Sequence, residues 1–170
     1  MDPAANADVL RLHDIPIEQA RQLLGLFGLQ LSLVPDGEPI TGSYWGECEA
    51  GLIGTTVFAR MDTPVHSLLH ESCHLIVLPP ERRAAVHTDA SDSIAEEDAT
   101  CYLQLLLAGR IDGFGFERAC RDMDAWGYTF RLGSAKAWFE QDAEDAHAFL
   151  QQRNLIPNQA EPALQRASEA

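Results

Sequence analysis

Long apolar runs are absent from this chain of 170 residues. Its longest apolar stretch, Leu23 to Val34, is interrupted by glycine and polar residues and is too short to cross a bilayer. The first residues also lack the basic and apolar regions of a secretory signal peptide. We therefore expect no membrane span, and we expect the protein in the cytoplasm.

Basic residues are scarce, because 12 lysines and arginines stand against 26 aspartates and glutamates and give a formal net charge of −14. Such a chain is repelled by the phosphate backbone of nucleic acids and by anionic lipids. The densest basic spot, Arg82 and Arg83, lies beside Glu81 and forms no patch. The composition thus predicts neither a nucleic-acid partner nor a membrane partner.

Cysteine is rare as well, and the four cysteines form no CxxC pair. We expect them to be reduced thiols, because a chain of this size does not need disulfides for stability. The hydrophobic fraction of 46% is ordinary for a globular protein. The length suits one domain, predicted at residues 15–153, between a flexible N-terminus (1–14) and a flexible C-terminal tail (154–170).

Local patterns predict an α+β fold, mostly helical with a small antiparallel or mixed sheet. Helical spacing of apolar residues, capping residues and alternating β-formers mark the elements. The sequence predicts helices at 15–27, 64–78, 81–86, 93–108, 116–126 and 134–152, strands at 29–33 and 52–60, and an ambiguous segment, helical or extended, at 128–132.

Capping residues support two of these helices. Asp62 or Thr63 is expected to cap the helix that ends before the Pro79-Pro80 pair. Ser93, with Glu96 three residues later, is typical of a capping box at the start of the helix 93–108.

The helix expected at 64–78 contains a motif whose residues can bind a metal ion. His70 and His74 are four residues apart, so their imidazoles lie on one helix face, one turn apart. Two neutral imidazoles so placed can bind one zinc ion at about 2.0–2.1 Å. Glu71 flanks that ion and can take a proton from a zinc-bound water and pass it to a leaving amine. The competing interpretation is a pair of histidines that merely fill or cap a core helix.

A catalytic zinc needs a third protein ligand and one open position. The helix 93–108 offers Glu96, Glu97 and Asp98, of which Glu96 is accounted for by the capping box. Asp98 shares its helix face with apolar residues, where a carboxylate needs a partner such as a metal. Glu97 shares a more polar face and complements the helix dipole. We therefore favour Asp98 as the third ligand, with Glu97 as the alternate.

Other polar residues are harder to place. A hydrolase needs a hydrogen-bond donor for the developing oxyanion, and Tyr128, Arg131 and His147 are candidates that the sequence does not rank. His66, one turn before His70, is interpreted as a first-turn surface residue. Cys73 is interpreted as a buried small hydrophobe.

These motifs resemble the minimal core of zincins, in particular the ImmA/IrrE-type metallopeptidases. Members typically carry an HExxH helix and then a segment similar to E-x-E-A-N-x-F-A-x-x-L-L, where residues 96–107 of this chain read EEDATCYLQLLL. In that register Asp98 takes the position of the metal-binding glutamate and Tyr102 the aromatic position. Aspartate for glutamate is a departure, because its shorter reach requires the two helices to approach more closely. The resemblance covers about residues 15–110.

The resemblance implies a zincin-like core and a zinc-dependent metallopeptidase with one zinc ion. Such an enzyme hydrolyses peptide bonds in a peptide or protein by glutamate-assisted attack of zinc-bound water. It also implies that an extended substrate pairs with the strand before the active-site helix, here Leu52 to Arg60. Two alternatives stay open: a catalytically silent metal-binding module for interaction or regulation, and a metal-dependent amidohydrolase that acts on a small molecule.

Overall fold

The computed structural model describes residues 8–43, 48–87 and 93–156. The fold is α+β, as predicted, and within these ranges no helix is both long and apolar enough to span a membrane. The described residues form the helices α1 (Ile17–Gly25), α2 (Val65–Val77), α3 (Pro80–Arg83), α4 (Ile94–Ala108), α5 (Gly115–Trp126), α6 (Ala135–Gln141) and α7 (Glu144–Gln152), and the strands β1 (Gln30–Leu33), β2 (Gly51–Ile53) and β3 (Thr56–Ala59).

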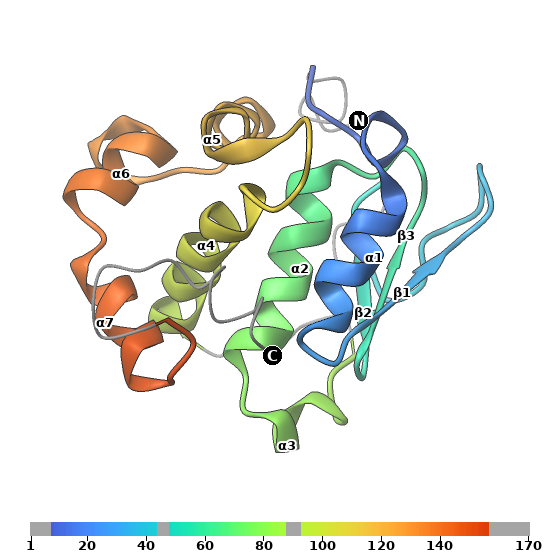
Figure 1. The fold of residues 1–170 in the computed structure, drawn as a ribbon, viewed down its shortest axis with the longest axis horizontal. Helices are drawn as coiled ribbons and strands as arrows, with labels where there is room; N and C mark the ends of the chain where they lie inside the picture. The colour runs from blue at the N-terminus through green and yellow to red at the C-terminus, as the bar shows by residue number, and fades with distance from the viewer. Residues whose placement is uncertain (1–7, 44–47, 88–92, 157–170) are drawn as a thin grey trace.

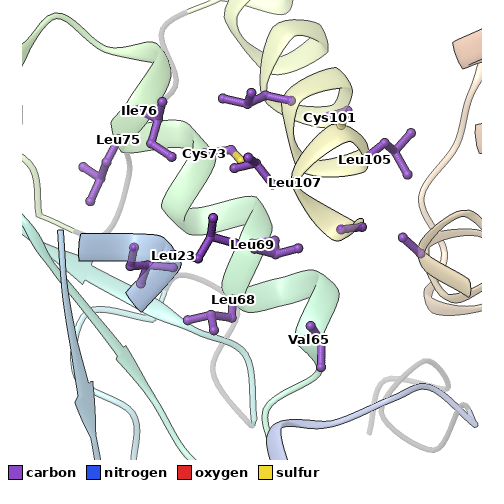
Figure 2. Close-up of a cluster of buried hydrophobic side chains, with 14 of the residues drawn as sticks. Leu23, Val65, Leu68, Leu69, Cys73, Leu75, Ile76, Cys101, Leu105 and Leu107 are labelled. Atoms are coloured by element: carbon purple, nitrogen blue, oxygen red, sulfur yellow. The ribbon is translucent and has the colours of Figure 1, made fainter. Parts of the chain in front are cut away.

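The helix α2 lies at the centre of the molecule. Figure 1 shows α4 on one side of it, with α5 to α7 beyond, and α1 with the sheet on the other side. Apolar side chains cover α2 on both of these sides, so Leu68 and Leu69 are fully buried in one cluster with Leu23 of α1 and Leu107 of α4 (Figure 2). The histidine motif is therefore held on the most enclosed element of the fold.

The sheet is mixed and has the strand order β1-β3-β2. β3 pairs in parallel with β1 and antiparallel with β2, so that Val57 lies between Leu31 and Leu52. The single strand expected at 52–60 is wrong, because the chain reverses at Gly54, whose φ of 59° is a left-handed conformation that glycine adopts easily.

The strand order also argues against the expectation that this segment pairs with an extended substrate. β3 has a neighbouring strand on each side, so an extended peptide cannot pair with it. β2 is the outer strand, but its Leu52 N–H already donates to the carbonyl of Gly42 at 3.2 Å, and Ser43 forms a bridge with Gly51. The preceding chain thus occupies part of the edge that was expected to bind substrate.

The helix ends agree with the sequence in part. α2 ends at Val77, before Pro79 as predicted, and Ser93 caps α4 by accepting a hydrogen bond from the Glu96 N–H at 3.1 Å. The expected cap of α2 is wrong, because Pro64 holds the cap position and makes no side-chain cap. Asp62 instead pairs with Arg60 at 2.7 Å.

Both ends of the predicted domain extend further than expected. Leu12 is fully buried, and the Leu10 N–H donates to the Asp122 carboxylate at 2.9 Å, so residues 8–14 pack onto the domain. Ile156 is buried as well. The remaining parts of the two segments expected to be flexible, residues 1–7 and 157–170, lie outside the described residues.

The long helix expected at 134–152 is two helices. The chain leaves helical geometry at Asp142, whose φ is −140°, and its carboxylate accepts two hydrogen bonds from the Arg131 guanidinium at 2.7 and 2.8 Å. The break lets α6 pack on α5 and α7 on α4. The segment 128–132 forms no strand, and its last two residues belong to a short 3-10 turn at Arg131–Gly133.

The central position of α2 predicts a steep stability cost for truncating its core side chains. Leu69→Ala, at a position with no exposed surface, is expected to lower the free energy of unfolding by about 2–5 kcal/mol. Ile94→Ala is the matched control, because Ile94 is 81% exposed and its truncation should change stability by less than about 0.5 kcal/mol. Urea unfolding of the metal-free proteins measures both, and equal midpoints for the two variants would contradict this account of the core.

Candidate metal centre

The two histidines of the motif meet on one face of α2. Their Nε2 atoms are 3.1 Å apart, and their rings are nearly perpendicular with centroids 4.6 Å apart. Ligand atoms of His70, Glu71 and His74 all lie within 4.8 Å of one another, so these three residues could hold a metal ion. The helical placement that the sequence predicted is confirmed.

A buried amide from α4 orients His70. The Gln104 Nε2 donates to the backbone carbonyl of His66 at 3.0 Å, and the Gln104 Oε1 lies 2.8 Å from Nδ1 of His70. Because the amide nitrogen faces a carbonyl, the amide oxygen accepts a hydrogen bond from the Nδ1–H of His70. The His70 Nε2 is thereby directed toward His74, which is the arrangement that supporting residues impose on metal-binding histidines.

Thr100 orients the His74 ring in the same way, through a longer hydrogen bond. Its hydroxyl donates to the Glu96 carbonyl at 2.8 Å, so its oxygen is left to accept a hydrogen bond from the Nδ1–H of His74 at 3.4 Å. Thr100 and Gln104 have no exposed surface. Their spacing of three and seven from Glu97 places all three on one face of α4, which from the sequence alone was interpreted as the wetter side.

The Glu97 carboxylate completes a triangle with the two imidazoles. Its Oε1 lies 2.9 Å from Nε2 of His70 and its Oε2 lies 3.4 Å from Nε2 of His74. In a tetrahedral zinc site, neighbouring ligand atoms are about 3.3–3.6 Å apart. Two imidazole nitrogens and one glutamate oxygen are also a donor set of catalytic zinc sites. The observed distances of 3.1, 2.9 and 3.4 Å are close to this spacing, so His70, His74 and Glu97 could hold a metal ion.

Asp98, the residue favoured from the sequence, lies elsewhere. It lines a second cavity with Arg131 and Asp142, and burial together with the neighbouring Glu97 charge raises the pKa of its carboxyl group. The preference for Asp98 is not supported by this geometry, and the alternate, Glu97, faces the histidines. The polar face of α4 was interpreted as wet, but it is polar because it packs on the histidines of α2.

Charge around His70 favours its protonated form in the metal-free protein. Burial lowers the pKa of this imidazole, but Tyr128, Cys101 and the Glu97 carboxylate outweigh it, so the pKa lies well above its ordinary value. The Nε2 of His70 lies 2.9 Å from Oε1 of Glu97, so a proton on this nitrogen would point at the carboxylate, where a metal ion would bind. Metal binding would therefore release this proton.

Cys101 borders the same cluster. One ligand atom each of His70, Glu97 and Cys101 lie within 4.8 Å of one another. All four cysteines are free and buried. Cys73 is buried as predicted, and burial raises the pKa of its thiol, so it stays protonated and apolar in character.

A cavity of about 270 Å³ opens beside the cluster. Among the three candidate oxyanion donors, Tyr128 lines this cavity, with its ring 5.4 Å from the His70 ring. Arg131 and His147 are engaged elsewhere, by Asp142 and by the Tyr102 hydroxyl, which lies 3.0 Å from Nδ1 of His147. The residues that line the cavity are Glu49, Ser67, His70, Glu71, Glu97, Trp126, Gly127 and Tyr128.

His66 is not the surface residue that was expected. Its side chain has no exposed surface, and its ring packs on Trp126 with centroids 5.1 Å apart. Its Nδ1 lies 3.2 Å from the Tyr128 hydroxyl. Burial lowers the pKa of His66 to about 3, so this imidazole is neutral at physiological pH.

No family model, no curated protein and no solved structure matches this chain. The interpretation of the site therefore rests on the geometry described above, and the likeness to ImmA/IrrE-type metallopeptidases stays a prediction.

Two neighbouring carboxylates allow a matched test of the metal ligands. Glu97→Gln is expected to weaken zinc binding about 10–100-fold. Asp98→Asn, one residue further along α4, should leave zinc binding unchanged. His74→Ala should abolish zinc binding. Competition with a chromogenic chelator measures the affinities, and circular dichroism checks the fold of each variant. The opposite pattern, with zinc lost in Asp98→Asn and kept in Glu97→Gln, would restore the preference from the sequence.

Proposed function

We propose that this protein is a zinc-dependent metallopeptidase with a zincin-like core. The observation that carries the proposal is the close approach of Glu97 to His70 and His74, at 2.9 and 3.4 Å, with Glu71 and Tyr128 at the same cavity. The order of elements also agrees with such a core, because a helix and strands precede the HExxH helix, and a helix with the third carboxylate follows it.

His70, His74 and Glu97 would hold the ion. When bound, zinc lowers the pKa of a coordinated water toward about 7 and polarises a carbonyl oxygen. The three protein ligands leave the fourth position free, as catalytic zinc sites require. Gln104 and Thr100 direct the two imidazoles, so little side-chain reorganisation is needed when the ion binds.

Glu71 is the general base of the proposed reaction. It follows His70 on α2 and lines the cavity, so its carboxylate faces the space in which water and substrate meet. There it takes the proton of the attacking water and passes it to the amine that leaves. A single carboxylate performs both transfers, because the proton returns to the nitrogen of the same peptide bond.

Tyr128 is the proposed donor to the carbonyl oxygen of the scissile bond. Burial raises the pKa of its hydroxyl, so the phenol stays protonated at physiological pH. A neutral donor at the cavity wall stabilises the negative charge that develops on the oxygen during attack. The substrate we propose is a peptide or protein, in line with the resemblance described above.

Cys101 favours a second candidate function, a catalytically silent metal module. Its sulfur lies within reach of the ligand atoms of His70 and Glu97. If Cys101 were the fourth ligand, the ion would have no open position, and closed sites of this kind are structural. The module would then bind or regulate a partner.

Replacement of Glu71 tests the enzyme. Glu71→Gln is expected to lower the turnover of a pool of internally quenched peptides by about 10²–10⁴-fold, because the base is lost while the ligands remain. Zinc content and thermal unfolding should stay those of the wild-type protein. Full cleavage by the variant would remove Glu71 from the mechanism, and a zinc-loaded wild type without peptidase activity would favour the silent module.

Replacement of Cys101 separates the open site from the closed one. For the open site, cobalt-loaded protein should lack a thiolate-to-metal charge-transfer band, and Cys101→Ser should keep the zinc affinity of the wild type. A strong charge-transfer band that disappears in Cys101→Ser, together with a large loss of zinc affinity, would show the closed site of a silent module.

A further inference from the structure

We infer that His66 is a positioning residue that turns the hydroxyl proton of Tyr128 into the cavity. It does so by donating its own Nδ1–H to the Tyr128 oxygen. The catalytic meaning of this contact rests on the proposed function, but the hydrogen-bond assignment does not.

The surroundings of His66 leave one of its ring nitrogens without a partner. Nδ1 lies 3.2 Å from the Tyr128 hydroxyl, while Nε2 is buried and has no hydrogen-bond partner among the described residues. The ring is enclosed by Trp126 at 5.1 Å and Tyr128 at 5.4 Å between centroids. The side chain is fully buried, so bulk water does not reach it.

The neutral ring has two possible tautomers with different consequences. With the proton on Nε2, a buried N–H has no acceptor, and Tyr128 must donate its proton to Nδ1. With the proton on Nδ1, the ring donates to Tyr128, and Nε2 keeps only an unused lone pair. Orphaned buried N–H groups are rarer in proteins than under-used acceptors, so the second tautomer is favoured.

Gln104 does not take the tyrosine proton, because its side chain is engaged with α2. Its oxygen accepts from the Nδ1–H of His70 at 2.8 Å, and its nitrogen donates to the His66 carbonyl at 3.0 Å. The amide oxygen is therefore already used as an acceptor.

The Tyr128 oxygen thus accepts a hydrogen bond from the buried Nδ1–H of His66, and its own O–H is left for the cavity that Tyr128 lines. This is the orientation that a donor to a developing oxyanion needs before the substrate arrives. If Tyr128 instead donated its hydroxyl proton to Nδ1 of His66, the contact would be merely structural, and that proton would point into the protein.

Nitrogen NMR decides the tautomer without any substrate or metal. Long-range ¹H–¹⁵N spectra of the full chain, labelled at histidine nitrogens and metal-free at neutral pH, report which ring nitrogen carries the proton. The His66 signals are assigned by their loss in His66→Asn. We expect Nδ1 protonated and Nε2 bare. Protonation at Nε2 would overturn the inference, because Tyr128 would then donate to His66.

The functional coupling is tested with acetohydroxamate, whose oxygens bind an open zinc and accept hydrogen bonds. His66→Phe and Tyr128→Phe should each weaken its binding to the zinc-loaded protein about 10–100-fold, and the double variant no further. His66→Asn should retain most of the affinity, because its amide N–H replaces Nδ1–H. Additive losses in the double variant would overturn the inference.

A second His–Tyr pair in the same chain is the control. His147 contacts the Tyr102 hydroxyl at 3.0 Å, away from the cavity, so His147→Asn should not change acetohydroxamate binding. A wild-type zinc-loaded protein that binds no acetohydroxamate would count against the open site of the proposed function. The NMR result would still decide the role of His66.

Discussion

The hydrogen bonds of Gln104 within the α2–α4 interface are the constraint on which the site depends. One buried amide contacts both the backbone of His66 and the imidazole of His70. A buried polar group without partners would destabilise the fold, so the positions of these two residues are set by the same requirement that keeps the core stable. The packing of α4 on α2 therefore also fixes the geometry of the site.

Much of the fold follows from local signals, because those signals act within a few residues. The Pro79-Pro80 pair ends α2, Ser93 caps α4, and the apolar spacing of α1 gives its buried face. The failures have two different sources. The reversal at Gly54 is a short local turn that a run of β-formers hid. The break between α6 and α7 at Asp142 is accompanied by a contact with Arg131, eleven residues earlier, which apolar periodicity does not reveal.

The candidate site shows the same division. The spacing of His70 and His74 was enough to place both imidazoles together, because i and i+4 share a helix face. Asp98 was favoured from the sequence as the third ligand, because the polar residues on α4 were equated with a solvent-facing side. Thr100 and Gln104 are fully buried and form the polar face that meets α2, which brings Glu97 rather than Asp98 to the histidines. Polar spacing on one helix is informative only when the polar face of its neighbour is considered with it.

The energetics of this interface argue against histidines that merely fill a core. Without a metal, His70 holds a proton against Glu97 in a setting where burial disfavours charge. The Glu97 side chain is 42% exposed, and ion pairs that water reaches contribute little, so such a pair is a poor device for stability alone. Elsewhere on α2, Leu68, Leu69 and Leu75 are buried in the apolar cluster. A divalent cation would remove the conflict, because it would replace the proton and satisfy both imidazoles and the carboxylate at once. The polar interface therefore suits a bound cation better than it suits a role in stability alone.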